Sequence, residues 1–154
     1  MTDTEKTGNQ FPHSLSFSVL REANMKRIPT FKNKKGEFIH NADGSDWSIS
    51  DWYEAMSGEA GEFANFHKKF RRGEMTEGEF LKEAAKELAD VQIYLDILAF
   101  RLGIDLGRAT FEKFNEVSSR VKSPIYMATA YQDYGILGSP LETIVIDRRE
   151  AEEF

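Results

Sequence analysis

Cysteine is absent from the 154 residues of this chain. The absence excludes disulfide bonds, thiolate zinc sites and cysteine nucleophiles, and it agrees with a reducing compartment. Histidine is scarce, with three residues at positions 13, 40 and 67. A ferritin-like di-iron site needs the pattern Glu-x-x-His twice, and only residues 37–40 match it. Any metal site in this chain is therefore expected to be built from carboxylates.

The chain also lacks long hydrophobic runs and an excess of positive charge. No apolar run approaches the about 20 residues that span a bilayer, and residues 1–10 are polar, unlike a signal peptide. We therefore expect no membrane association and a cytoplasmic location. The formal net charge of −6 argues against broad nucleic-acid binding, so a phosphate ligand would need a metal ion. Neither a Walker A loop nor a Rossmann glycine fingerprint is present.

Apolar residues recur at helical spacing through most of the chain, and capping signals separate the repeats. Ser48 or Ser50 is suited to begin one helix, and Gly73 to end it. Thr76 with Glu79 resembles a capping box, and Asp105 is suited to cap the last helix. The predicted helices span about residues 15–28, 48–72, 76–102 and 105–122.

These elements predict an all-α fold, an antiparallel helical bundle with a short irregular C-terminal tail. We expect a flexible N-terminus over residues 1–12, one helical domain over 13–122, and a tail over 123–154. The tail is able to form a short strand or to take part in oligomer contacts. Residues 29–46 are predicted to be a long loop, either a lid or nucleobase contact or a solvated connector.

Two acidic pairs carry the strongest chemical signal. Glu59 and Glu62 lie on one predicted helix, and Glu87 and Asp90 on the next, each pair at i,i+3 spacing. This spacing places both side chains of a pair on one helix face. Four carboxylates facing each other repel unless a cation lies among them, and Mg²⁺ suits oxygen ligands and phosphates. The small and apolar residues that flank the four acids indicate that these helix faces are half-buried. Glu83, one turn before Glu87, is either an outer contact of the metal site or a solvated acid.

Basic and aromatic residues are candidates for binding a substrate. Lys113 and Arg120 are seven residues apart on one predicted helix, so they share a face and could reach phosphate oxygens. Asn115 lies between them as a further candidate contact. Trp47, beside the polar loop, is the candidate for nucleobase contact. The cations of residues 68–72 are explained by the helix dipole alone, although they could also reach phosphate.

At these residues the sequence resembles the MazG-like members of the all-α nucleoside triphosphate pyrophosphohydrolases. The resemblance covers about residues 47–120 and is clearest in GEAGEFANF at 58–66 and KELADVQIYLDILAFRLGIDL at 86–106. Upstream, REANMKRIPTFKN and DGSDWSISDW are similar to bacteriophage-encoded proteins of this type. The ordered combination of Glu-x-x-Glu, Glu-x-x-Asp and a downstream Lys is more specific than either acidic pair.

This resemblance implies hydrolysis of a (d)NTP to the (d)NMP and pyrophosphate, in a nucleotide-pool or house-cleaning role. It implies that Mg²⁺, with Mn²⁺ as a substitute, is held by Glu59, Glu62, Glu87 and Asp90, and that Lys113 contacts phosphate. It also implies a homodimer or homotetramer. Two alternatives stay open from the residues: a helical interaction module without catalysis, and a related all-α enzyme such as a phosphoribosyl-ATP pyrophosphatase or a dimeric dUTPase.

Overall fold

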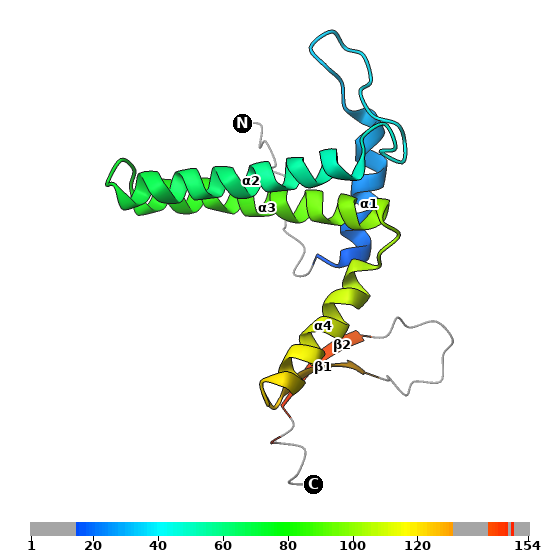
Figure 1. Ribbon diagram of the computed structural model, residues 1–154, viewed down its shortest axis with the longest axis vertical. Helices are drawn as coiled ribbons and strands as arrows, with labels where there is room; N and C mark the ends of the chain where they lie inside the picture. The colour runs from blue at the N-terminus through cyan, green and yellow to red at the C-terminus, as the bar shows by residue number, and fades with distance from the viewer. Residues whose placement is uncertain (1–14, 131–141, 148, 150–154) are drawn as a thin grey trace, which may run out of the picture. The chain divides into compact units, whose positions relative to one another are not determined.

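The computed structural model describes residues 15–130, 142–147 and 149 (Figure 1). The predicted flexible segment 1–12 lies outside these residues. The described chain is mostly helical, which confirms the all-α prediction, and in this part no helix has the length and apolar character to cross a membrane. Its elements in order are α1 (Phe17–Arg27), a 3-10 turn (Ile28–Thr30), α2 (Ile49–Arg71), α3 (Glu77–Arg101), α4 (Leu106–Arg120), β1 (Ile125–Ala130) and β2 (Glu142–Asp147).

The helices α2 and α3 form a long antiparallel hairpin (Figure 1). Ser48 caps α2 in a capping box with Asp51, and Thr76 caps α3 in a second one with Glu79. Gly73 lies between them with a φ of +73°, a conformation in which glycine carries no steric penalty. Local sequence alone therefore sets the ends of both helices, as predicted.

The closed end of the hairpin differs from its open end. Near the turn, Phe70 and Phe80 stack with ring centroids 5.0 Å apart. At the other end Trp52 is buried beside Ile28 and Ile97, and it approaches Tyr94 at 6.2 Å between ring centroids. This buried apolar cluster fixes the register of α2 against α3, since burial of large side chains is the main stabilising term.

Helix α1 crosses α3 at this open end (Figure 1) and is joined to it by a buried polar network. Asp96 on α3 is 1% exposed and accepts hydrogen bonds from Arg21 Nε at 3.0 Å and from Asn24 Nδ2 at 2.9 Å. Asn24 is likewise 1% exposed. The network satisfies a buried charge, which is costly to leave without partners.

The segment predicted to be a long loop is folded against the start of α2. His40 Nδ1 donates a hydrogen bond to the Asp46 carboxylate at 2.8 Å, and the Trp52 indole N–H donates to the Gly44 carbonyl at 3.0 Å. A Cβ on Gly44 would lie 3.0 Å from the Trp52 ring, and the φ of this residue is +66°. The base of the loop is thus tied to the core, whereas Phe38, farther out, is 65% exposed.

Residues Met1–Ile104 and Asp105–Phe154 form two compact units, each described by itself. The predicted boundary was at 122/123, but the structure divides the chain before α4 because α4 packs on β1. Asn115 accepts a hydrogen bond from Met127 N at 2.8 Å and donates to Met127 O at 2.9 Å. These two bonds hold the strand along the helix.

The C-terminal tail is more regular than predicted. Strands β1 and β2 pair antiparallel, with Ile125 opposite Asp147 and Ala130 opposite Glu142. The β-branched run at 143–146 favours a strand, and pairing with β1 satisfies backbone groups that a lone strand would leave free. The expectation that the tail can form a short strand is thus confirmed, and residues 125–130 and 142–147 are regular where irregular chain was also expected.

Candidate metal centre

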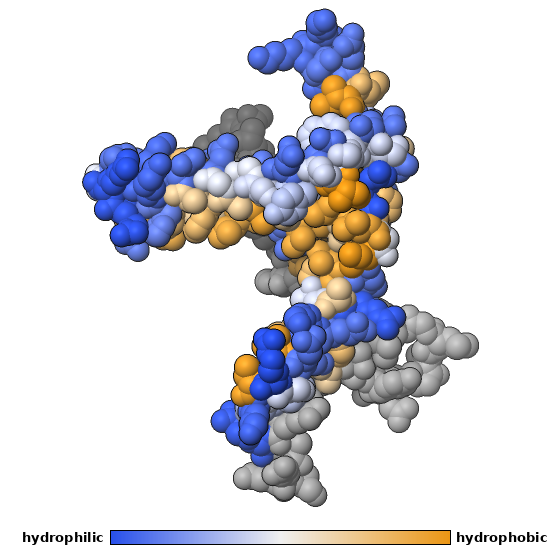
Figure 2. Space-filling view, in the orientation of Figure 1, coloured by the Kyte–Doolittle hydropathy of each residue, from blue (hydrophilic) through white to orange (hydrophobic). Residues whose placement is uncertain are grey.

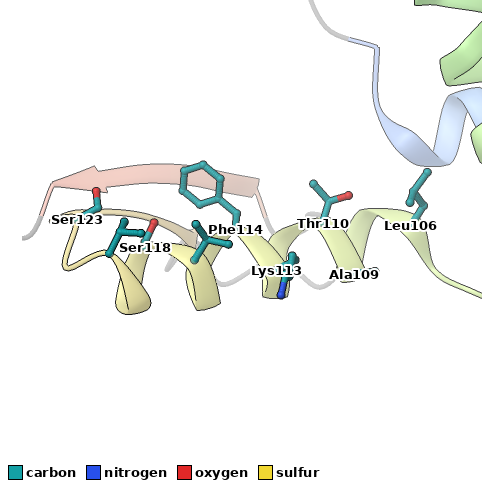
Figure 3. Close-up of a pocket in the computed structure, with 9 residues that line it drawn as sticks. Leu106, Ala109, Thr110, Lys113, Phe114, Ser118 and Ser123 are labelled. Carbon is teal, nitrogen blue, oxygen red and sulfur yellow. The ribbon is translucent and has the colours of Figure 1, made fainter. Parts of the chain in front are cut away.

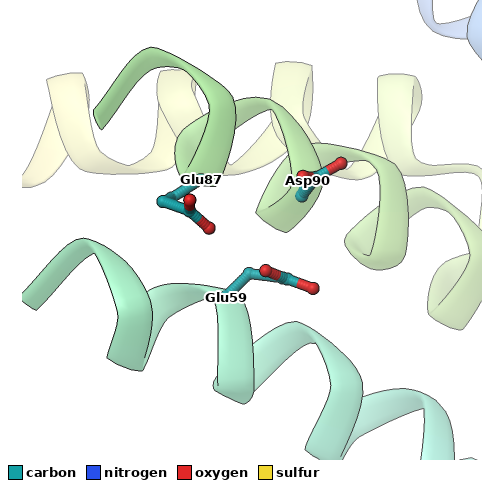
Figure 4. Close-up of side chains that lie close together, drawn as sticks. All are labelled: Glu59, Glu87 and Asp90. Atoms are coloured by element: carbon teal, nitrogen blue, oxygen red, sulfur yellow. The ribbon is translucent and has the colours of Figure 1, made fainter. Parts of the chain in front are cut away.

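Three carboxylates meet between α2 and α3. Glu59 on α2 faces Glu87 and Asp90 on α3, one helical turn apart from each other (Figure 4). One oxygen from each side chain lies within 4.8 Å of the other two. The antiparallel register that places Trp52 beside Tyr94 also places residue 59 opposite residues 87–90. The predicted convergence of the two acidic faces is thus found for three of the four acids.

The three carboxylates are partly buried, and no cationic side chain of the described residues neutralises their charge. Glu87 is 8% exposed, and Glu59 and Asp90 are half-buried. Among the residues that the structure describes, no lysine or arginine pairs with any of the three carboxylates. Repulsion between the acids must therefore be relieved by protons or by a cation from solution.

The electrostatics of Glu59 reflect this crowding. Burial raises the pKa of Glu59 above its ordinary value of 4.5, and the nearby carboxyls of Asp90, Glu87 and Glu62 raise it further. Burial also raises the pKa of Tyr94, with additional contributions from the charges of Glu59 and Asp90. Both shifts have the same physical origin, since negative charge gathered at low dielectric disfavours further negative charge.

A hard divalent cation fits this donor set. All three side chains offer carboxylate oxygens, which are the ligands that Mg²⁺ and Mn²⁺ prefer, and histidine and thiolate donors are not part of the group. Mg²⁺ keeps several waters or substrate oxygens when one or two carboxylates bind it. These three residues could hold such an ion.

Glu62 and Glu83 lie outside the three-carboxylate group. Glu62 is exposed, although its charge contributes to the raised pKa of Glu59. Its role as a metal ligand stays a prediction. Glu83 accepts a hydrogen bond from Lys86 at 2.6 Å, which favours the interpretation of a solvated acid.

The predicted phosphate contacts belong to the C-terminal unit. Lys113 is exposed and pairs with Glu116 at 2.6 Å, and Arg120 is exposed on the same helix. Asn115 uses both polar atoms of its side chain on the backbone of Met127. The structure thus gives Asn115 a structural role, and the substrate contacts of all three residues stay predictions.

Trp47 is packed more closely than a free stacking platform. It is half-buried, with ring centroids 4.7 Å from Trp52 and 4.9 Å from His40. Sequence reasoning placed it beside a loop but could not show that the loop folds back on it. Contact with a nucleobase stays a prediction that must use the exposed part of this ring.

Sequence reasoning missed Tyr94. This residue follows Asp90 by four positions and Glu87 by seven on α3, so its side chain lies on the same helix face. The charges of both Glu59 and Asp90 raise the pKa of Tyr94, which agrees with this shared face. The i,i+4 spacing was the signal that could have found it.

Neutralising Glu59 should stabilise the metal-free protein. Two unit charges about 5 Å apart repel by about 3 kcal/mol at an effective dielectric constant of about 20. Solvent screens part of this repulsion, so in EDTA we expect Glu59→Gln to raise the free energy of unfolding by about 1 kcal/mol. Urea denaturation of both proteins at pH 7.5 measures the difference.

The pH dependence of the stability difference between Glu59→Gln and the wild type tests whether charge repulsion causes it. Because the folded state raises the pKa of Glu59, it binds a proton there more tightly than the unfolded state does. The contribution of Glu59 to wild-type stability in EDTA therefore falls as pH rises above 4.5. The advantage of Glu59→Gln should therefore shrink toward pH 4 and grow toward pH 7.5. An advantage that does not change with pH would contradict the explanation by charge crowding.

The three carboxylates and their surroundings are thus defined by the chain's own geometry. Helices α2 and α3 carry them, and burial and mutual repulsion raise the pKa of Glu59. Tyr94 lies on the same face of α3. Comparison of the chain with models of protein families, with curated proteins and with solved structures gave no match.

Proposed function

We propose that this protein is a Mg²⁺-dependent nucleoside triphosphate pyrophosphohydrolase, which converts a (d)NTP to the (d)NMP and pyrophosphate in a nucleotide-pool or house-cleaning role. The observation that carries the proposal is the group of Glu59, Glu87 and Asp90, which face each other across α2 and α3 and pair with no cationic side chain of the described residues. The resemblance to MazG-like enzymes supports it, because that family's acidic motifs coincide with these residues.

The proposed reaction joins a water oxygen to the α-phosphorus and breaks the bond between that phosphorus and the oxygen bridging to the β-phosphate. Pyrophosphate leaves with the bridging oxygen, and a base takes a proton from the water. A bound Mg²⁺ supplies Lewis-acid chemistry, since it lowers the pKa of a bound water and offsets charge on phosphate oxygens. A carboxylate of the acidic group is suited to accept the proton from the attacking water.

Substrate recognition is proposed for residues outside the acidic group. Lys113 and Glu116 form a solvent-exposed pair, which solvent screens strongly, so phosphate can replace Glu116 as the partner of Lys113. Arg120 is exposed and able to bind phosphate in a bidentate way. Trp47 is proposed to contact the base by its exposed edge.

A panel of substrates tests the reaction. Pyrophosphate release is measured from canonical and modified (d)NTPs with Mg²⁺, with Mn²⁺ and with EDTA. Release that requires the metal, with a (d)NMP as the other product, would support the proposal and identify the base and sugar. Release from phosphoribosyl-ATP alone would assign the chain to a related reaction, and Mg²⁺ binding without any cleavage would refute the pyrophosphohydrolase.

We also propose that the protein is a homodimer or homotetramer, and that α4 contributes to the interface. One side of α4 carries a groove of about 600 Å³ lined mainly by apolar side chains (Figure 3). Phe114 and Val121 in this groove are 39% and 61% exposed. Apolar surface of this kind commonly marks contact sites.

Charged substitutions in the groove should weaken self-association. We expect Phe114→Glu with Val121→Glu to raise the dissociation constant of the oligomer at least about tenfold, because burying an unpaired carboxylate is unfavourable. Sedimentation velocity over a range of protein concentrations measures the effect. The matched control is Glu112→Gln with Arg108→Gln on an exposed part of α4, which should leave the oligomer intact. A wild-type protein that stays monomeric at high concentration would refute the proposal.

A further inference from the structure

A basic cleft lies at the C-terminal end of α2, where the α2–α3 hairpin presents a hydrophilic surface (Figure 2). Its volume is about 420 Å³, and its lining consists of Ala64, His67, Lys68, Arg71 and Arg72. Three permanent cations thus line one small depression of a chain whose net charge is −6. We infer that this cleft binds the phosphate groups of a ligand that carries a chain of phosphates.

Among the described residues, the cations of the cleft have few close acidic partners. No acidic side chain of the described residues pairs with Lys68 or Arg71, and Arg72 approaches only Glu74, at 3.7 Å. Several other helical cations do pair with acids three or four positions away. These pairs are Lys26 with Glu22, Lys86 with Glu83, Arg108 with Glu112, and Lys113 with Glu116.

The helix dipole accounts for only part of this arrangement. The negative end of a helix favours cations over its last turn, but it does not require them to surround one cleft. Lys69 in the same turn lies over the Phe66 ring at 5.2 Å instead of lining the cleft. Lys68, Arg71 and Arg72 share a helix face, and like charges so gathered are relieved by an anion among them.

The chemistry of the lining favours phosphate over a nucleobase. Arginine offers a planar fork of N–H donors that matches phosphate oxygens, and lysine adds a point charge. Ala64 is the only aliphatic residue of the lining, and the His67 ring packs against Phe80 with centroids 5.7 Å apart. The cleft therefore presents donors for charged oxygens and little surface for stacking.

The cleft is separate from the acidic group. Lys68 follows Glu59 by nine residues on α2, which is about two and a half turns and a rise of about 13 Å. Its side chain thus leaves the helix on the side opposite to Glu59. A phosphate chain in the cleft is a second ligand and does not share the metal proposed for the acids.

Titration of the full-length protein with tripolyphosphate in EDTA tests the inference, because chelation removes divalent ions from the acidic group. We expect saturable binding with one site per chain by calorimetry. The double variant Lys68→Gln, Arg71→Gln should weaken it at least tenfold at constant ionic strength. The matched control Lys26→Gln, Lys86→Gln removes the same charge from paired helical positions and should change binding less than twofold.

Titrations with other ligands show which kind of phosphate compound the cleft binds. ATP binding as tightly as tripolyphosphate supports recognition of the phosphate chain alone. Tighter binding of a single-stranded oligonucleotide at equal phosphate concentration would overturn the assignment in favour of nucleic acid. Equal losses in both double variants, or no saturable binding to the wild type, would also overturn it. Circular dichroism verifies folding, and Lys68→Gln alone, with a smaller expected loss, replaces the double variant if that variant unfolds.

Discussion

Replacing Glu87 by glutamine is expected to lower Mg²⁺-dependent pyrophosphate release by about a hundredfold or more. Residues that merely support metal ligands typically contribute about 10- to 100-fold to affinity or activity, and Glu87 belongs to the proposed ligand set itself. Glutamine keeps the size of the side chain but removes a charged oxygen. The folded structure should persist, because the substitution relieves repulsion between acids.

The measurement is the initial rate of pyrophosphate release at saturating Mg²⁺, with folding verified by circular dichroism. The matched control is Glu83→Gln, one turn earlier on α3, where the acid pairs with Lys86 at the surface. It should retain most of the wild-type rate. Activity that survives Glu87→Gln, or that falls equally in both variants, would show that the acidic group is not the catalytic metal centre.

The ends of the helices could be predicted because local signals set them. Capping side chains at residues 48, 76 and 105 and the glycine at 73 act within a few residues of chain, and the structure shows each in its expected place. The division before α4 and the pairing of β1 with β2 could not be predicted in the same way. Both depend on contacts between segments whose register has no local signal, such as the bonds from Asn115 to Met127.

In the candidate site, too, local spacing predicted some features, whereas others depend on how the helices pack. Spacing within each acidic pair predicted a shared helix face, and the structure brings Glu59, Glu87 and Asp90 together. Periodicity could not show that Glu62 lies on the exposed side of the hairpin, since that depends on the rotation of α2 against α3. Tyr94 was missed because a tyrosine among apolar residues looks like part of a core.

Replacing Asp96 by alanine is expected to lower the free energy of unfolding by about 3–5 kcal/mol, the usual cost of breaking a buried charge pair. Asp96 is 1% exposed and accepts from both Arg21 and Asn24. Its loss leaves these two donors of α1 without their acceptor and opens the contact between α1 and α3. Urea denaturation measures the change, and Asp96→Asn should lose less because it keeps an acceptor oxygen.

Substitutions of Asp96 and of Glu87 should therefore have different effects, the first on stability and the second on catalysis. Asp96 faces α1, whereas Glu87 faces α2, so the two acids of α3 serve different contacts. Folded Asp96→Asn protein should release pyrophosphate at nearly the wild-type rate. Glu87→Gln should be at least as stable as the wild type in EDTA, but with Mg²⁺ it should show the large loss of rate described above. If Asp96→Ala lost less than about 1 kcal/mol, the polar network would not be what holds α1. Apolar packing around Ile28 would then have to be responsible, because that residue follows α1 directly and is 1% exposed.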